Sequence, residues 1–311
     1  MTRIVMAIVA ALLLQATPDG QIIASRPVEL PGVAQAAGIR PYATPSEYEA
    51  ARSDSSIQTL RIVYSSSGLP VVAYAFVPRD HPRPLPAVIF NRGGYVQPEI
   101  AHQMAPMAQR LVHAGFVVIA PMLRGSAGAP GKDEMGGADL DDLLAVQPLV
   151  ARLPYVDADN LFLYGESRGG VMSLMASRRG FRARAIATVG AFTSLEKLMA
   201  DRPDIYAPVI PVIWPLWAQQ RERIVESRSA LAWPAQIAAP VLLMHGGADT
   251  DVNPSQTLAL ASALQALGKP YELRVFADDN HVLTAHRVER DRMAVEWFTR
   301  FLAPTTARSI P

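Results

Sequence analysis

The sequence predicts an α/β fold in which a mostly parallel sheet carries helices on both faces. From Ala87 onward, short hydrophobic runs alternate with longer segments of helical period. Half of the 311 residues are hydrophobic and 18% are charged, which is typical of a globular chain that buries a full core. The chain contains no internal repeat. These observations together favour one large α/β domain over an array of small repeated units.

A proline-rich stretch and a hairpin precede the alternating region. Residues 25–57 predict an irregular lead-in with one helical turn near Ser46 to Arg52. Two runs rich in Val, Ile and Tyr, Leu60 to Tyr64 and Val71 to Val77, flank a serine-glycine turn and predict a β-hairpin. We divide the chain into a leader (1–24), the lead-in (25–57), an α/β domain (58–303) and a tail (304–311).

The alternating region predicts the strands and helices of the parallel sheet. The predicted strands are residues 87–91, 116–120, 161–164, 185–189, 241–245 and 271–276, and the predicted helices are residues 100–114, 140–153, 170–177, 255–267 and 286–302. Pro148 predicts a kink in the second helix. Residues 191–239 follow the sixth strand, counted from the hairpin, and are too long for a simple connection. They predict a helical excursion that either walls a substrate pocket or covers the sheet edge.

The strand at residues 161–164 leads into Gly165-Glu166-Ser167-Arg168-Gly169, which has the form G-x-S-x-G. A strand before this motif and a helix after it are the context of a nucleophile elbow, where a sharp turn requires small residues around the serine. The helix directs its N-terminus at the serine and favours negative charge there. Ser167 is therefore the predicted nucleophile, and the alternative is an ordinary glycine-rich turn.

A serine nucleophile needs a base, and the base needs a carboxylate that holds its tautomer. One late strand runs into Asp249 and Asp251, and the last strand runs into His281. Among the six histidines, His281 is the one that follows a strand, after the acid, in a loop; His286 is the second candidate. The order serine, acid, histidine is typical of α/β hydrolases. The residues leave open which aspartate is the acid, since either could instead cap a helix.

The oxyanion of a tetrahedral intermediate needs hydrogen-bond donors. The backbone N–H of Arg168, the residue after the nucleophile, is one predicted donor. The second is expected from the loop after Asn91, where Gly93-Gly94 allows close backbone approach, with Gly94 first and Tyr95 second, unless the pair only forms a tight turn. A further hypothesis is that Arg168 or Arg92 pairs with a substrate carboxylate. Residues expected to contact substrate are Arg92, Tyr95, Asp251, Trp214 and Trp217.

Composition and motifs exclude several other classes of protein. Lys and Arg number 29 against 28 Asp and Glu, so no strong field attracts nucleic acid or an anionic membrane. The absence of cysteine excludes disulfides, thiolate metal sites and a cysteine nucleophile. Gly125 to Lys132 has the wrong glycine spacing for a phosphate loop, and no metal-binding motif is present. We therefore expect no cofactor and no metal.

The first residues carry an export-like pattern. Arg3 precedes an uncharged run, Ile4 to Leu14, that is too short to span a bilayer but fits the hydrophobic region of a secretory signal. We expect cleavage after Ala16 or Ala24 and a periplasmic or secreted protein of a bacterial envelope, without a membrane span once the signal is removed. An uncleaved N-terminal anchor is the alternative.

Several blocks in order resemble the catalytic domain of prolyl oligopeptidase-type serine peptidases, within the α/β-hydrolase fold, over residues 60–302. These blocks are Arg92 to Tyr95, Arg124 to Gly128, Gly136 to Asp142, Val156-Asp157 with Leu161 to Gly170, Pro240 to Pro254 with Gln256, and Gly268 to Leu273. The resemblance implies Ser167 as nucleophile, Asp249 as orienting acid and His281 as general base. Two departures are Arg168, where an aromatic residue is common, and Arg92, where histidine or tyrosine is frequent.

The resemblance implies a serine hydrolase that forms an acyl-enzyme and cleaves peptide bonds of small peptides. Peptidases of this family usually carry a large N-terminal β-propeller, whereas fewer than 60 residues precede the hydrolase core here. Carboxylester hydrolysis is therefore the alternative function. A non-catalytic binding protein that has kept the fold is the second alternative.

Overall fold

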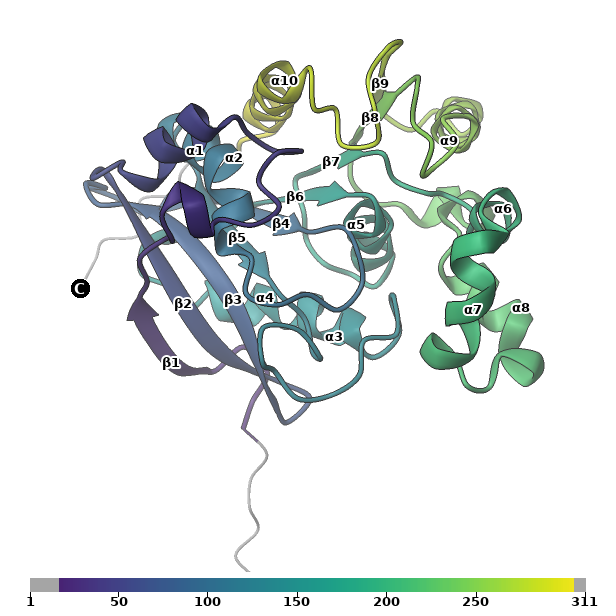
Figure 1. Ribbon diagram of the computed structural model, residues 1–311, viewed down its shortest axis with the longest axis horizontal. Helices are drawn as coiled ribbons and strands as arrows, with labels where there is room; N and C mark the ends of the chain where they lie inside the picture. Colours follow the sequence, from purple (N-terminus) through teal and green to yellow (C-terminus); the bar gives the residue numbers. More distant parts are fainter. Residues whose placement is uncertain (1–16, 305–311) are drawn as a thin grey trace, which may run out of the picture.

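The computed structural model describes residues 17–304, which fold around a single nine-stranded sheet (Figure 1). The strands are β1 (Ile22–Pro27), β2 (Ile57–Ser66), β3 (Leu69–Pro78), β4 (Leu85–Asn91), β5 (Val117–Pro121), β6 (Val156–Glu166), β7 (Ala185–Val189), β8 (Val241–Gly246) and β9 (Tyr271–Phe276). Their order in the sheet is β1-β2-β3-β5-β4-β6-β7-β8-β9. The pairs β1·β2, β2·β3 and β3·β5 are antiparallel, and the remaining pairs are parallel. The predicted mostly parallel sheet is confirmed.

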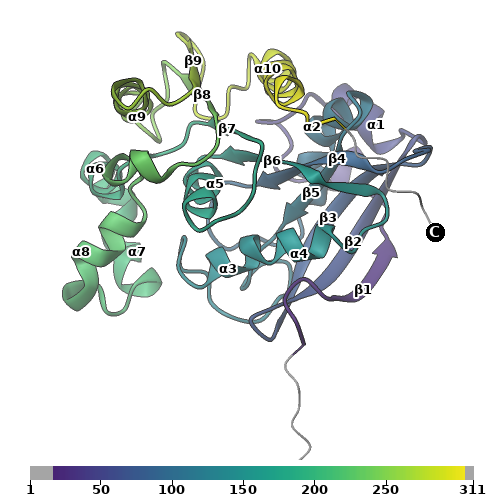
Figure 2. The ribbon, with the colours of Figure 1, turned by 180° about the vertical axis from the view of Figure 1, so that it is seen from behind.

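Helices cover both faces of this sheet, as Figures 1 and 2 show from opposite sides. The helices are α1 (Pro45–Arg52), α2 (Ala101–His113), α3 (Asp139–Leu144), α4 (Val146–Val150), α5 (Arg168–Arg178), α6 (Leu195–Asp201), α7 (Pro203–Ile213), α8 (Trp217–Ser227), α9 (Ser255–Ala266) and α10 (Arg287–Arg300). One apolar core contains side chains of α3, α4, α5 and α9, and a second contains side chains of α2 and α10. In β3, Val71 and Ala73 face the first core and Val72 and Tyr74 face the second, as the two-residue period of a strand requires.

The lead-in is more regular than the sequence predicts. β1 crosses the predicted boundary between leader and lead-in, at residues 24 and 25, and pairs with β2 at the edge of the sheet, although almost all of its residues are exposed. Because an exposed edge strand is held mainly by backbone hydrogen bonds, it shows no alternation of apolar residues from which it could be predicted. The predicted helical turn is the two-turn helix α1, which starts with a capping box between Thr44 and Glu47.

The predicted kink at Pro148 is a break between two short helices. α3 ends at Leu144, four residues before the proline, and α4 begins at Val146, two residues before it. Pro148 has no N–H to donate to the carbonyl of Leu144, so the helical hydrogen-bond ladder is interrupted at this point. Leu143 and Leu149, on either side of the break, are both fully buried.

The long excursion after β7 contains α6, α7 and α8, which extend together at one end of the molecule (Figure 1). Its length was predicted to require helices, and this is confirmed. The excursion follows the seventh strand of the chain and not the sixth, because the prediction did not include β1. Within residues 17–304, no helix combines the length and apolar character needed to cross a bilayer. Most of the predicted leader (residues 1–16) and most of the predicted tail (305–311) lie outside the described residues.

Candidate active site

Ser167 lies at a strained turn between β6 and α5. Its φ and ψ angles are 54° and −122°, a backbone conformation that residues other than glycine rarely adopt. The turn is held because the Ser167 N–H donates to the Val189 carbonyl at 2.7 Å. A methyl group on Gly169 would overlap the carbonyl of Asn91, so the small residues of the motif are required for close packing of the turn against β4.

Asp249 and His281 are joined directly. His281 Nδ1 lies 2.8 Å from Asp249 Oδ2, although the two residues are 32 positions apart. The other carboxylate oxygen accepts the backbone N–H groups of Asp251 at 2.8 Å and Val252 at 2.9 Å. Burial alone would raise the pKa of the Asp249 carboxyl, but hydrogen bonds from His245 and His281 hold that pKa well below its usual value. Asp249 is therefore held as a carboxylate in contact with the His281 ring.

The His281 imidazole is also confined by its neighbours, and nearby charges change its pKa. A Cβ atom on Gly190, whose φ angle is 55°, would lie 2.9 Å from His281 Nδ1, so only glycine leaves room for the ring. Burial lowers the pKa of His281, but the hydrogen bond and charge of Asp249, with the charge of Glu166, raise it above its usual value overall. An imidazole with Nδ1 held in this way can exchange a proton through Nε2.

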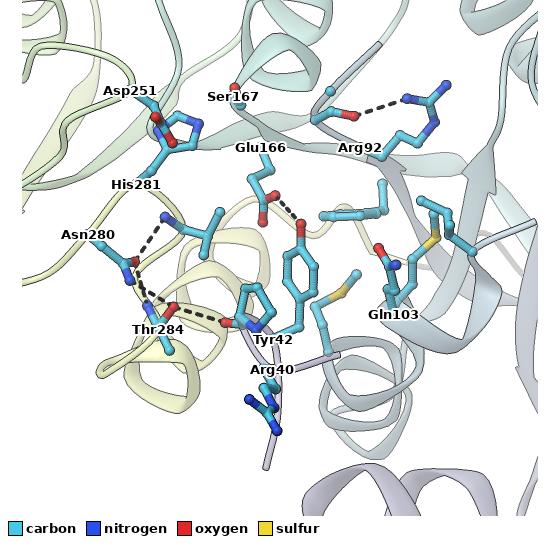
Figure 3. A pocket seen from close by; sticks show the side chains of 18 of the residues that line it. Arg40, Tyr42, Arg92, Gln103, Glu166, Ser167, Asp251, Asn280, His281 and Thr284 are labelled. Carbon is cyan, nitrogen blue, oxygen red and sulfur yellow. Dashed lines mark hydrogen bonds between the residues drawn. The ribbon is translucent and has the colours of Figure 1, made fainter. Parts of the chain in front are cut away.

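Ser167 and His281 line the same cavity, which has a volume of about 630 Å³ (Figure 3). Gly93 and Gly94 line it as well, and a Cβ atom on Gly93 would lie 3.2 Å from Ser167 Cβ. The structure thus brings together the predicted nucleophile, the predicted base and the predicted oxyanion loop. Asp249 contacts His281 but is not itself among the residues that line the cavity. Asp251 does line the cavity, and it pairs with Arg202 at 3.1 Å.

Several cavity residues were not predicted, among them Tyr42, Glu166 and Arg290. The Tyr42 hydroxyl donates to Glu166 Oε1 at 3.2 Å, and Arg290 Nη1 lies 3.8 Å from Glu166 Oε2. Burial raises the pKa of the Glu166 carboxyl, and this effect outweighs the nearby charge of Arg290. The position of Glu166 beside Ser167 is a sequence signal that could have identified it. Tyr42 lies in the lead-in, 124 positions away, and no pattern in the sequence links the two.

Several residues expected to contact substrate have other partners. The Tyr95 hydroxyl donates to the Asp133 carbonyl at 3.0 Å. Trp214 stacks on Trp217 with ring centroids 5.5 Å apart, and its indole N–H donates to the Glu134 carbonyl. None of these three is among the described residues that line the cavity. Their positions place residues 214–217 against the loop before α3 rather than at Ser167.

Other predicted groups are also accounted for. Arg92 lines the cavity, but its guanidinium donates to backbone carbonyls and to Ser126. Arg168 has a side chain that is 3% exposed and pairs with Asp133 and Asp139. His286, the second candidate for the base, pairs with Asp279 at 2.8 Å. Both arginines are therefore bound within the protein instead of facing a substrate carboxylate.

Among the side chains of residues 17–304, one set has ligand atoms close enough for a metal ion. Atoms of Asp249, Asp251 and His281 lie within 4.8 Å of one another. Two of these groups are already hydrogen-bonded to each other, and the third forms an ion pair with Arg202. The arrangement fits an acid-base pair with a neighbouring carboxylate, and we assign it no metal.

Comparison with known protein families agrees with this geometry. The model of the prolyl oligopeptidase family matches residues 102–305. The chain belongs to the prolyl oligopeptidase family. It is therefore a serine hydrolase, and the resemblance seen in the sequence is confirmed.

Relatives in this family differ widely in length. The chain is 28% identical to an uncharacterized peptidase, YtmA, of Bacillus subtilis, over 72% of this chain and 86% of the relative. It is 26% identical to dipeptidyl-peptidase 5 of Porphyromonas gingivalis, over 65% of this chain and 31% of the relative. The chain thus corresponds to nearly the whole length of the first relative but to less than a third of the second.

Solved structures confirm the α/β-hydrolase fold. The acylaminoacyl peptidase of Pyrococcus horikoshii superimposes with a TM-score of 0.67 at 20% identity, covering 81% of this chain and 43% of that one. An acetyl xylan esterase from Paenibacillus superimposes with a TM-score of 0.64 at 18% identity, covering 80% of this chain and 86% of that one. At these identities the similarity concerns the fold alone.

Proposed function

We propose that this chain hydrolyses peptide bonds of small peptides, with Ser167 as nucleophile, His281 as general base and Asp249 as the orienting acid. The observation that carries the proposal is the 2.8 Å contact between Asp249 Oδ2 and His281 Nδ1, beside a cavity that His281 shares with Ser167. Membership of a peptidase family supports amide bonds as the reacting group.

The chemistry follows from the placement of these groups. His281 Nε2 takes the proton of Ser167 Oγ as the oxygen attacks the substrate carbonyl, and Asp249 stabilises the imidazolium that forms. The backbone N–H groups of Arg168 and Gly94 donate to the oxyanion. His281 then gives its proton to the leaving amine as the carbon–nitrogen bond breaks and an acyl-enzyme remains. Water repeats the sequence and releases the acid.

The cavity supports a small substrate. Its volume of about 630 Å³ is within the range of roughly 300–1,000 Å³ that suits small molecules. One wall is formed by apolar side chains, and another by the lead-in. The apolar wall consists of Phe90, Ile100, Met104 and Met107, and the lead-in contributes Arg40, Pro41 and Tyr42. A short peptide with an apolar side chain fits this combination better than a long chain.

Carboxylester hydrolysis is the alternative. The acetyl xylan esterase matched above has a similar total length, since 86% of it is covered. The same nucleophile, base and oxyanion donors would serve an ester, whose leaving group is easier to expel. A protein that retained the fold only for binding is the second alternative, and it would show no turnover at all.

A panel of short peptide amides beside unactivated esters tests the proposal. We expect turnover of at least one amide, and loss of that turnover in Ser167→Ala. Hydrolysis restricted to esters would assign the alternative activity. Activated nitrophenyl esters are unsuitable for this purpose because serine peptidases and esterases both cleave them.

We also propose that the protein is exported. The export-like pattern of residues 3–16 supports this, and the fold favours one of the two cleavage positions. Ala24 lies within β1, so cleavage after it would divide a strand of the sheet, whereas cleavage after Ala16 would leave β1 whole. N-terminal sequencing of the mature protein distinguishes the two positions.

A further inference from the structure

We propose that Arg92 and Arg168 are positioning residues that fix the peptide groups of residues 93–95, and so set the direction of the N–H groups offered to the oxyanion. This inference rests on the proposed function. It concerns two side chains for which the triad has no use, and it replaces the hypothesis that they bind a substrate carboxylate.

Each arginine donates to a carbonyl of the loop. Arg92 Nη1 lies 3.0 Å from the Gly93 oxygen and 2.7 Å from the Tyr95 oxygen. Arg168 Nη1 lies 3.0 Å from the Gly94 oxygen. All three consecutive carbonyls of residues 93–95 therefore accept a hydrogen bond from a buried guanidinium. The two cations together hold a loop that has no regular secondary structure of its own.

The planarity of the peptide group turns these contacts into a constraint on the donors. In a trans peptide, the carbonyl of one residue and the N–H of the next point in opposite directions. A donor on the Gly93 oxygen therefore directs the Gly94 N–H to the other side of the loop, and a donor on the Gly94 oxygen does the same for the Tyr95 N–H. Gly93 and Gly94 line the cavity that contains Ser167, so this other side is where an oxyanion would lie.

Glycine makes this arrangement sterically feasible. Gly94 has a φ angle of 72°, which a residue with a side chain rarely adopts. Gly93 approaches the nucleophile so closely that a Cβ atom would lie 3.2 Å from Ser167 Cβ. The Tyr95 side chain anchors the end of the loop at the Asp133 carbonyl, but the two glycines have no side chains to hold their own conformations. The hydrogen bonds from the two arginines supply that restraint.

The arginines are themselves fixed by surrounding groups. Arg168 pairs with Asp133 Oδ2 at 2.6 Å and with Asp139 Oδ2 at 2.7 Å, and both carboxylates are fully buried. Arg92 Nη2 donates to the Met122 carbonyl at 2.9 Å and to Ser126 Oγ at 2.7 Å.

Asp139 is in turn well anchored. Its carboxylate accepts backbone N–H groups of Glu134, Gly136 and Gly137. Burial opposes the ionised form, but Arg168 and these N–H groups lower the pKa of Asp139 below its usual value. The blocks around Ser126 and Asp139, which the sequence singled out and the triad leaves unexplained, thus support the oxyanion loop through Arg92 and Arg168.

Arg168 links the two proposed donors. Its own backbone N–H follows the nucleophile, and its side chain reaches the loop that provides the second donor. A change confined to this side chain should therefore misalign the loop donors while Ser167, His281 and Asp249 keep their contacts. Misplacement of a reacting group by about 1 Å reduces rates by up to roughly 10²-fold.

The test compares Arg168→Gln and Arg168→Lys on a substrate that the wild type cleaves. We expect kcat of Arg168→Gln to fall about 10- to 10²-fold with KM within about twofold of wild type. We expect its affinity for a peptide boronic acid, which forms a tetrahedral adduct with the serine, to fall by the same factor as kcat/KM. Arg168→Lys keeps the charge but not the two-pronged geometry, and should restore part of kcat.

A matched control is available at the opposite end of the same helix. Arg179, at the C-terminal end of α5, forms an exposed pair with Asp141 at 3.3 Å, and Arg179→Gln should leave kcat and boronate affinity unchanged. Thermal unfolding of every variant separates misalignment from loss of the fold. If Arg168→Gln does not fold, Arg168→Lys and Asp133→Asn decide the question by the same readouts.

Three outcomes overturn the inference. Wild-type kcat in folded Arg168→Gln shows that the side chain does not position the donors. A raised KM with unchanged kcat assigns Arg168 to substrate binding instead. A loss of boronate affinity that does not follow kcat/KM separates the defect from the oxyanion. If the wild type neither turns over any substrate nor binds the boronic acid, the proposed function fails and this inference fails with it.

Discussion

His245 Nε2 lies 2.9 Å from Asp249 Oδ2, the same oxygen that accepts from His281 Nδ1. His245 is fully buried at the end of β8, and its Nε2 also lies 3.0 Å from the Val252 carbonyl. Because both neighbours of Nε2 are acceptors, this nitrogen carries a proton. Nδ1 lies 2.6 Å from the Thr257 hydroxyl, which fixes the ring from the other side. Two imidazoles therefore hold one carboxylate.

This contact predicts a role for His245 in orienting Asp249. His245→Asn removes a hydrogen bond to a buried carboxylate and leaves the ring of His281 less firmly held. We expect kcat to fall about 10-fold with little change in KM, since loss of geometry and not of substrate contacts is involved. His113→Gln is the matched control, because His113 Nε2 lies 2.8 Å from Asp54 at the surface. Equal kcat in both variants would contradict the role.

The charge of Glu166 predicts a shift in the pH profile. His281 acts as a base only when neutral, so kcat/KM should fall as the pH drops through its pKa, which lies above the usual value of about 6.5. Glu166 is one of the charges that raise this pKa. In Glu166→Gln the acid limb should therefore move to lower pH. A profile of kcat/KM between about pH 5 and pH 9 measures it, and an unmoved limb or one at higher pH would count against the assignment.

From the position of Tyr42 in the cavity wall, we predict that the lead-in limits the size of the substrate. Tyr42 lines the cavity and donates to Glu166, so Tyr42→Ala removes part of the wall and widens the entrance. We expect KM for dipeptide amides to rise about 10-fold, while longer peptides lose less or gain in kcat/KM. Tyr42→Phe, which removes only the hydroxyl, should retain the size preference. An unchanged preference in Tyr42→Ala would show that other residues set it.

The contact between Glu47 and Arg287 predicts a pH-dependent contribution to stability. Glu47 Oε2 lies 2.6 Å from Arg287 Nη2 and links α1 to the start of α10. Although burial alone would raise it, the hydrogen bonds from Arg287 and Thr44 lower the pKa of Glu47 to about 2. A lowered carboxyl pKa stabilises the fold above the unfolded value of about 4.3, and this contribution is lost as the pH falls towards 2.

Glu47→Gln should therefore reduce the free energy of unfolding near neutral pH. The Glu47 side chain is 29% exposed, so solvent reaches the pair and screening limits the expected loss to about 1 kcal/mol or less. Urea unfolding at several pH values measures the difference between variant and wild type. That difference should shrink as the pH falls below about 4, and a difference that is constant or grows on acidification would exclude the ion pair as its cause.

The triad candidates could be predicted because each follows a predicted strand. The carboxyl ends of parallel strands meet at one edge of a sheet, so Ser167, Asp249 and His281 share an edge once β6, β8 and β9 are recognised. Local patterns were sufficient for this step. The orientation of individual side chains at the edge was not determined by those patterns.

Contacts between distant loops could not be predicted in the same way. Tyr42 contacts Glu166 because of the course that the lead-in takes over the fold. The sequence of the lead-in has no hydrophobic period from which this course could be predicted. The partners of Arg168 are likewise set by tertiary structure. From the sequence, a cation next to a nucleophile suggests a group that binds substrate. In the fold, Asp133 and Asp139 neutralise this cation. Trp214 is expected near the substrate because it lies in the long excursion, but its indole N–H donates to the Glu134 carbonyl.

The central claim is that Ser167 is a nucleophile activated by His281. Treatment of the folded protein with a fluorophosphonate probe, followed by intact mass and peptide mapping, tests it most directly. We expect one adduct, on Ser167, that is absent in Ser167→Ala and forms far more slowly in His281→Ala. A folded wild type that stays unlabelled, or an adduct that maps to another residue, would contradict the account.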